Sequence, residues 1–184
     1  MSGFEFIFSL FGLILGLALA EGLGGLTRAI KARGIRTIGW STGLLGLFVS
    51  CDVVTFWMYG WAMRDQLPLS WPVMFGGFVV TAVYYVSTAL VFPDAVDRDS
   101  DLDAHFERNY RTVIGGLLFC NVVLLGLVFA LLSPTLDLRS AILSMSFFPV
   151  SLIAILVRKR PVVIACLIWL IALYPASAVW HWSA

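Results

Sequence analysis

Six apolar runs divide this chain, and they constrain its fold more than any other feature of the sequence. Each run reaches the roughly 20 residues that an α-helix needs to cross about 30 Å of hydrocarbon. A segment that spans a bilayer must satisfy its backbone polar groups internally, which favours helices for runs of this length. The runs cover residues 4–26, 36–63, 70–92, 112–132, 138–157 and 161–180. We therefore predict an all-α integral membrane protein, a six-transmembrane-helix bundle that forms a single domain over residues 1–184.

The composition excludes the soluble classes. Hydrophobic residues make up 60% of the chain and charged residues 12%, and the net charge is +1. Soluble domains have roughly 45–50% apolar and 25% charged residues. A near-neutral chain also lacks the basic surface that binds nucleic acid. We expect the lipid bilayer as partner, no nucleic acid, and the inner (plasma) membrane of a bacterium as the location.

Two of the six runs are less clear than the others. Within the first run, the apolar stretch from Phe6 to Ala18-Leu19-Ala20 resembles a signal peptide with its cleavage site. The residues before it include Glu5 and no Lys or Arg, so we expect a retained helix. The fifth is the weakest span, because polar residues and a proline dilute it: Ser140, Ser144, Ser146, Pro149 and Ser151.

The basic residues of the short loops predict the orientation. All but Arg64 and Arg139 of the 12 basic residues lie between runs one and two, three and four, or five and six. The positive-inside rule therefore places these three loops in the cytoplasm and both termini on the outer side. Tryptophans that favour the membrane interface would then form a belt at the outer side: Trp57, Trp61, Trp71, Trp180 and Trp182.

Asp52 is the most informative single residue, because it lies well inside the second run between Cys51 and Val53. A carboxylic acid at this depth is costly and marks a candidate functional site. The alternative is a structural anchor that accepts hydrogen bonds from neighbouring helices, and the sequence leaves both open.

Other polar residues of the runs are predicted to form a polar path with Asp52. Asn121 falls at its level, as do Tyr84 and Tyr174, while Glu21 would lie near the cytoplasmic mouth or pair with basic loop residues. The candidate path comprises Asp52, Asn121, Glu21, Ser144, Ser146 and Tyr85. For the serines and tyrosines, separate helix-to-helix hydrogen bonds are the more common role.

Glycines recur at helical spacing in the first two runs and predict close packing between them. Small residues let helix backbones approach in lipid, where apolar burial does not drive association. The residues are Gly12, Gly16 and Gly24 in the first run, with Gly39, Gly43 and Gly46 in the second. We favour scaffold packing over a gating role for them.

Runs three and six can be aligned without a gap, which places Pro72 over Pro161 and Tyr85 over Tyr174. With three helices in each half, this weak similarity indicates an inverted 3+3 repeat, an arrangement found in many transporters.

The acidic segment 93–111 is expected to lie in the cytoplasm. An amphipathic helix should begin near Ser100 and Asp103 and continue into the fourth run. Its apolar stripe of Leu102, Phe106 and Tyr110 would lie along the membrane surface or on a neighbouring subunit. The spaced aspartates do not fit a calcium loop, because Leu102 stands where glycine is required.

The sequence predicts no enzyme, metal site or cofactor. Cys51, Cys120 and Cys166 lie apart in apolar runs, and His105 and His181 are too peripheral to ligate a haem within the membrane. No hydrolase, metalloprotease or nucleotide-binding motif is present.

Three functions remain open. The first is an oligomeric channel or transporter for a small ion or polar solute, with Asp52 in the intramembrane site. The second is a non-catalytic scaffold or accessory subunit that docks a membrane-protein partner. The third is a binder of lipid, quinone or pigment, with Trp57, Tyr59, Trp61 and Trp71 as the wall of its pocket.

Overall fold

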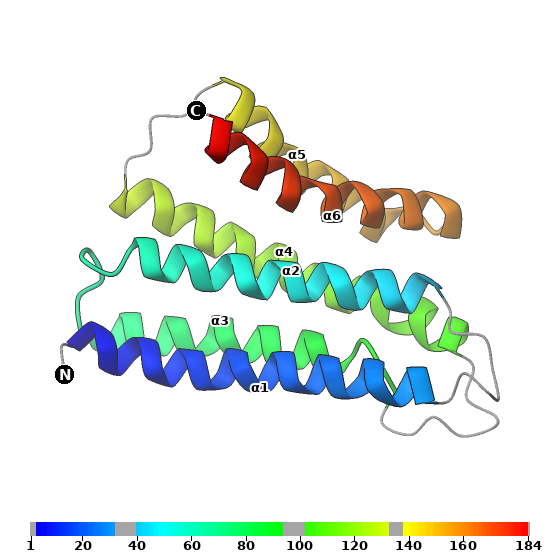
Figure 1. Cartoon of the computed structure of the whole chain (residues 1–184), viewed down its shortest axis with the longest axis horizontal. Helices are drawn as coiled ribbons and strands as arrows, with labels where there is room; N and C mark the ends of the chain where they lie inside the picture. The colour runs from blue at the N-terminus through cyan, green and yellow to red at the C-terminus, as the bar shows by residue number, and fades with distance from the viewer. Residues whose placement is uncertain (1–2, 32–39, 94–101, 133–137, 184) are drawn as a thin grey trace.

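The described residues form six α-helices, and none of them lies in a strand. The structure is a computed structural model that describes residues 3–31, 40–93, 102–132 and 138–183. The helices are α1 (Gly3–Lys31), α2 (Trp40–Ala62), α3 (Trp71–Ala89), α4 (Leu102–Leu131), α5 (Leu138–Leu156) and α6 (Arg160–Ser183). Successive helices run in alternating directions, so α1 begins and α6 ends toward the same end of the bundle (Figure 1). The predicted all-helical class is confirmed.

Five helices are long and apolar enough to cross a membrane: α1, α2, α3, α4 and α6. These five helices indicate a membrane-embedded protein. The part of α5 with described side chains, Ile142–Leu156, is shorter and falls outside this group. Pro149 lies inside α5 and Pro175 inside α6, while Pro72 occupies the first turn of α3, where its missing N–H costs nothing.

The fourth helix is longer than a membrane span, because the predicted amphipathic helix and the fourth run form one continuous 30-residue element. The sequence suggested that its apolar stripe lies along the membrane surface or on a neighbouring subunit, and this prediction is wrong. Leu102, Phe106 and Tyr110 are 7%, 1% and 2% exposed, so the stripe faces the interior of the bundle. The acidic residues 94–101, with the cap predicted at Ser100, lie outside the described residues.

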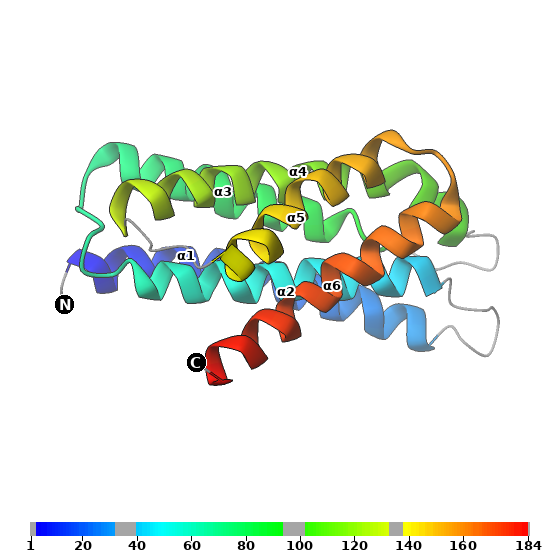
Figure 2. The same cartoon turned by 90° about the horizontal axis from the view of Figure 1, so that it is seen from above.

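Helix α2 lies at the centre of the bundle and contacts α1, α3, α4 and α6 (Figures 1 and 2). Its buried face carries Leu45, Phe48, Val49 and Val53, all at most 1% exposed. The core continues through α4 and α6, where Leu117 and Leu167 are fully buried. This central position puts the acid of α2 within reach of three other helices.

The glycine faces of α1 and α2 do not meet as predicted, because α1 packs more extensively against α3. On that side, a Cβ added at Gly22 would lie 2.8 Å from Thr88, and one added at Gly25 would lie 2.6 Å from Phe92. Of the predicted packing glycines, Gly12 is covered by Trp57 of α2 and Gly46 lies against Phe92. Gly16 and Gly43 face open space, Gly24 is near only Arg28 of its own helix, and Gly39 lies outside the described residues.

The contact between α1 and α3 has no counterpart in the described part of the second half of the chain. Helix α1 packs along α3, whereas the corresponding helices α4 and α6 do not pack along one another within the described residues. These two helices are bridged instead by side chains near the N-terminal ends of both.

Candidate functional site

Asp52 is buried at the centre of the bundle, with 2% of its surface exposed. Its carboxylate accepts hydrogen bonds from Tyr84 of α3, Asn121 of α4 and Tyr174 of α6. We call these four residues the Asp52 cluster. The packing of α2 against three helices brings together residues that are 32, 69 and 122 positions from Asp52 in the sequence.

Both carboxylate oxygens of Asp52 accept hydrogen bonds from the donors of the Asp52 cluster. Oδ1 accepts from the Tyr174 hydroxyl at 2.7 Å and from Asn121 Nδ2 at 3.0 Å. Oδ2 accepts from Asn121 Nδ2 at 2.8 Å and from the Tyr84 hydroxyl at 3.0 Å. Because one N–H of Asn121 donates to the Leu117 carbonyl, the other is shared between the two oxygens, and three donor groups serve the roughly four lone-pair sites of the carboxylate. Among the described residues, no basic side chain forms an ion pair with it.

Aromatic side chains pack against the Asp52 cluster, in which Asp52 and Tyr84 are buried and Asn121 and Tyr174 are half-buried. The Phe56 ring lies 5.1 Å from the Tyr84 ring, and the Phe48 ring lies 6.4 Å from the Tyr174 ring. Asn121 also donates to the Leu117 carbonyl at 3.0 Å, which fixes its amide. Hydrogen bonds in such an environment are strong, and the cost of leaving one donor unpaired is high.

Only Asn121 of the predicted path residues lies beside Asp52. Tyr85 is 41% exposed on the outer face of α3, and Glu21 forms an ion pair with Arg28 at 3.0 Å. Ser144 is exposed, and Ser146 donates to the Leu143 carbonyl and accepts from the Trp169 indole at 3.4 Å.

Tyr84 and Tyr174 complete the Asp52 cluster, although the predicted path named Tyr85 in place of Tyr84. The distinguishing signal lies in the helical period of α3. Val80 and Thr88, one turn before and one turn after Tyr84, are both buried, whereas Val86, beside Tyr85, is 53% exposed.

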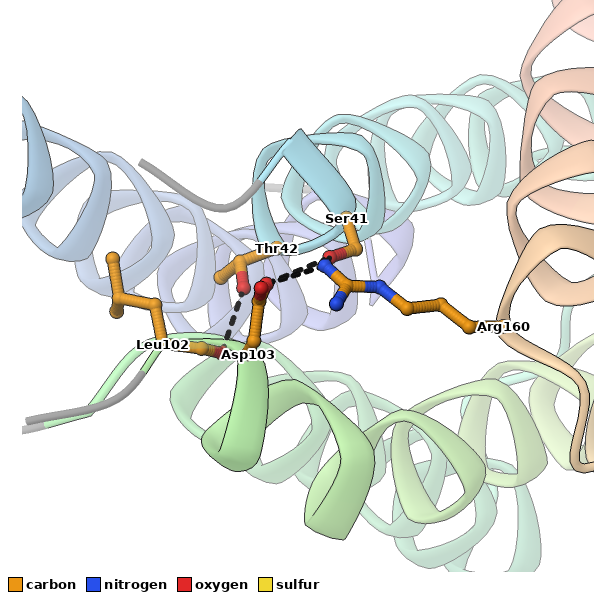
Figure 3. A network of polar contacts seen from close by, with 5 residues as sticks. All are labelled: Ser41, Thr42, Leu102, Asp103 and Arg160. Atoms are coloured by element: carbon orange, nitrogen blue, oxygen red, sulfur yellow. Dashed lines mark hydrogen bonds and ion pairs between the residues drawn. The ribbon is translucent and has the colours of Figure 1, made fainter. Parts of the chain in front are cut away.

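A second polar cluster joins α2, α4 and α6 at the end of the bundle where α4 and α6 begin (Figure 3). Arg160 forms an ion pair with Asp103 and donates to the Ser41 hydroxyl at 3.0 Å, while Thr42 donates to the Leu102 carbonyl at 3.3 Å. We call these five residues the Arg160 cluster. Ser41 and Thr42 are fully buried, whereas the charged pair is about two-fifths exposed. The sequence predicted Arg160 as a loop charge and Asp103 at the start of the amphipathic helix, and it gave no sign that the two residues pair with each other and with Ser41.

An apolar cavity of about 350 Å³ lies between α1, α2, α3 and α4. Its wall includes Trp57, but the four aromatic residues proposed as a pocket wall do not gather there. Tyr59 and Trp61 are exposed, and Trp71 stacks on Phe75 with ring centroids 5.0 Å apart. The side chains of Trp180 and Trp182 lie outside the described residues.

No group of three or more His, Cys, Asp or Glu side chains within the described ranges is placed to hold a metal ion. The chemistry offered by the Asp52 cluster is therefore that of a carboxylate held by neutral donors. Comparison with protein-family models, with curated proteins and with solved structures gives no significant match for this chain.

Proposed function

We propose that the protein is a small membrane transporter for an ion or polar solute, and that Asp52 is its intramembrane binding group. The observation that carries this proposal is the buried carboxylate, which accepts hydrogen bonds from three other helices. A carboxylate is the natural partner of a proton or a small cation, so a cation is the expected substrate or coupling ion.

The energetics of Asp52 support a functional role over a structural one. An Asp at the centre of a membrane helix costs about 2.5–3.5 kcal/mol on insertion scales. Interhelical side-chain hydrogen bonds in membranes return only about 0.6 kcal/mol each on average. Three donor groups, one of them near the upper value of about 1.7 kcal/mol, together contribute about 3 kcal/mol, which roughly balances the cost and leaves no clear stabilising surplus. A neutral side chain would anchor the helices at lower cost.

The Asp52 cluster links the state of the acid to the positions of the helices. When the carboxylate is neutralised by a proton or a cation, the donors of Tyr84, Asn121 and Tyr174 lose the charge that orients them. Charge-assisted hydrogen bonds are roughly twice as strong as neutral ones. Binding at Asp52 would therefore loosen the contacts of α2 with α3, α4 and α6 together.

The Arg160 cluster joins α2, α4 and α6 a second time, at one end of the bundle. Between the two clusters, these helices carry a fully buried apolar layer that includes Phe48, Ile114 and Leu167. An apolar layer closed at its end by an ion pair suits the role of a gate. We place this gate at the cytoplasmic side, with six spans and both termini outside, because that orientation satisfies the distribution of basic residues.

Proton and cation flux in proteoliposomes tests the proposal. Wild-type protein should dissipate an imposed proton, sodium or potassium gradient, read with an internal pH dye or a cation-selective dye. Asp52→Asn should abolish or alter this flux. It should still fold, because the Asn carbonyl accepts from the tyrosines and its amide can donate to their oxygens. Asp65→Asn is the matched control, since it removes the same charge from a loop side chain that is 74% exposed.

Two results would overturn the transport proposal: equal flux in wild type and Asp52→Asn, or no wild-type flux for any of these ions. The accessory-subunit alternative predicts a different pattern. There Asp52→Asn is mild, Asp52→Leu disrupts the fold, and mild-detergent purification recovers a second polypeptide.

A further inference from the structure

We propose that the apolar cavity between α1, α2, α3 and α4 is a binding site for one acyl chain of a membrane phospholipid. This inference does not depend on transport at Asp52. The cavity measures about 350 Å³ and is walled by side chains that include Phe11, Leu15, Phe56, Val80 and Val123. Every one of these groups presents only carbon to the space.

The size and direction of the cavity suit a hydrocarbon chain. At ~30 Å³ for a water molecule, and a similar volume for a methylene, the space holds roughly a dozen such groups. Along α3 the wall runs from Pro72 to Val80, a span of about 12 Å at 1.5 Å per residue. The cavity thus extends from the loop between α2 and α3 toward the bundle centre, parallel to the helices and to lipid chains.

The surroundings of the cavity exclude a polar occupant and give access to lipid. Phe56 lines the cavity and packs against Tyr84, so it separates the space from the Asp52 cluster. Trp57, Pro72 and Gly76 also line it and are exposed on the surface of spanning helices. Acyl chains are therefore the neighbouring molecules, and an unfilled cavity would forfeit dispersion contacts along its walls.

A positively charged side chain, that of Arg64, lies close to the loop end of the cavity. Met63 lines the cavity, and Arg64 follows it directly with its guanidinium over the Trp61 ring, 5.1 Å from the centroid. Its contact with Asp65 is long, at 3.5 Å, and exposed. A phosphate headgroup above the bound chain would find this positive charge near the membrane interface, which favours a phospholipid over an uncharged apolar molecule.

Gly76 lies on the cavity wall and leaves room for a larger side chain, so we use its substitution to test whether a lipid chain occupies the cavity. A Cβ added at Gly76 would meet no atom within 4 Å, so Gly76→Leu projects into open space, and Gly76→Ala fills it partly. Gly126→Leu is the matched control. Gly126 is an exposed helical glycine with equally open surroundings, and it does not line the cavity.

The test uses vesicles containing a phosphatidylglycerol with a diazirine in the middle of one acyl chain. After photolysis, mass spectrometry maps the labelled peptides. In wild type and Gly126→Leu, we expect labelling of the wall segments 8–15 and 72–80. Gly76→Leu should lower it several-fold and Gly76→Ala less. Labelling at Ile168 and Trp169, which are exposed on α6, serves as an internal reference for ordinary lipid contact.

Native mass spectrometry after detergent exchange identifies what remains bound. One retained phospholipid in wild type and Gly126→Leu, lost in Gly76→Leu, supports the proposal. A retained isoprenoid quinone in place of a phospholipid would overturn it. So would cavity labelling that keeps the same ratio to the α6 reference in Gly76→Leu and wild type.

Discussion

Tyr174→Phe removes one donor of the Asp52 cluster and nothing else. The Tyr174 hydroxyl donates to Asp52 Oδ1 at 2.7 Å, the shortest hydrogen bond to that carboxylate. Phenylalanine keeps the ring, and with it the packing against Phe48 at 6.4 Å between centroids. The variant therefore isolates the contribution of a single hydrogen bond between α2 and α6.

The expected loss follows from the acceptor and its surroundings. Interhelical side-chain bonds in membranes average about 0.6 kcal/mol and reach about 1.7 kcal/mol. Bonds to charged groups contribute about 1.5–3 kcal/mol in proteins generally. Because Asp52 is buried and the bond is short, we expect Tyr174→Phe to lower the free energy of unfolding by about 1.5 kcal/mol, the upper part of the membrane range.

Titration with a denaturing detergent, followed by circular dichroism, measures this difference in mixed micelles. Tyr85→Phe is the control, because Tyr85 is 41% exposed and the structure gives it no hydrogen bond within the described residues. The free energy of unfolding of Tyr85→Phe should differ from that of the wild type by no more than about 0.5 kcal/mol. If Tyr174→Phe lowers the free energy of unfolding no more than Tyr85→Phe does, the hydrogen bond from Tyr174 to Asp52 does not stabilise the fold.

Three further predictions concern packing, the Arg160 cluster and orientation. Gly25→Ala should destabilise the bundle by about 1–3 kcal/mol in the same titration, because the new methyl would lie 2.6 Å from Phe92; Gly16→Ala should not, since open space surrounds Gly16. Arg160→Gln should lower the free energy of unfolding by at most about 1 kcal/mol, because the ion pair with Asp103 is partly exposed. The same substitution should increase thiol labelling of a Ser41→Cys variant. Unchanged labelling would show that the Arg160 cluster does not close that end of the bundle. In intact cells, an impermeant maleimide should label Asp65→Cys and not Lys159→Cys; the reverse pattern would invert the proposed orientation.

The sequence predicts the helices and the Asp52–Asn121 pair for a common reason. Hydropathy reports depth in the membrane, and both residues are strongly polar groups at a similar depth. The choice between Tyr84 and Tyr85 depends on rotation about the helix axis, which depth does not specify. Tyr84 proves to share the buried face with Val80 and Thr88, and Tyr85 does not.

The first turns of α4 show a second limit of sequence patterns. Leu102, Phe106 and Tyr110 form a clear apolar stripe, but a lipid surface and a protein interior satisfy such a stripe equally well. The structure buries it, and this burial positions Asp103 to meet Arg160. That contact joins residues 57 positions apart and could not be inferred from local spacing.

The order in which the Asp52 cluster is synthesised has a consequence for biogenesis. The acid emerges from the ribosome with α2, before any of its donors exists, and the last donor follows 122 residues later with α6. Until α3 and α4 supply Tyr84 and Asn121 the insertion penalty of the second helix is uncompensated, and until α6 follows it is compensated only in part. Each later helix retains α2 more firmly, so premature termination before α6 should yield a chain that quality-control proteases remove.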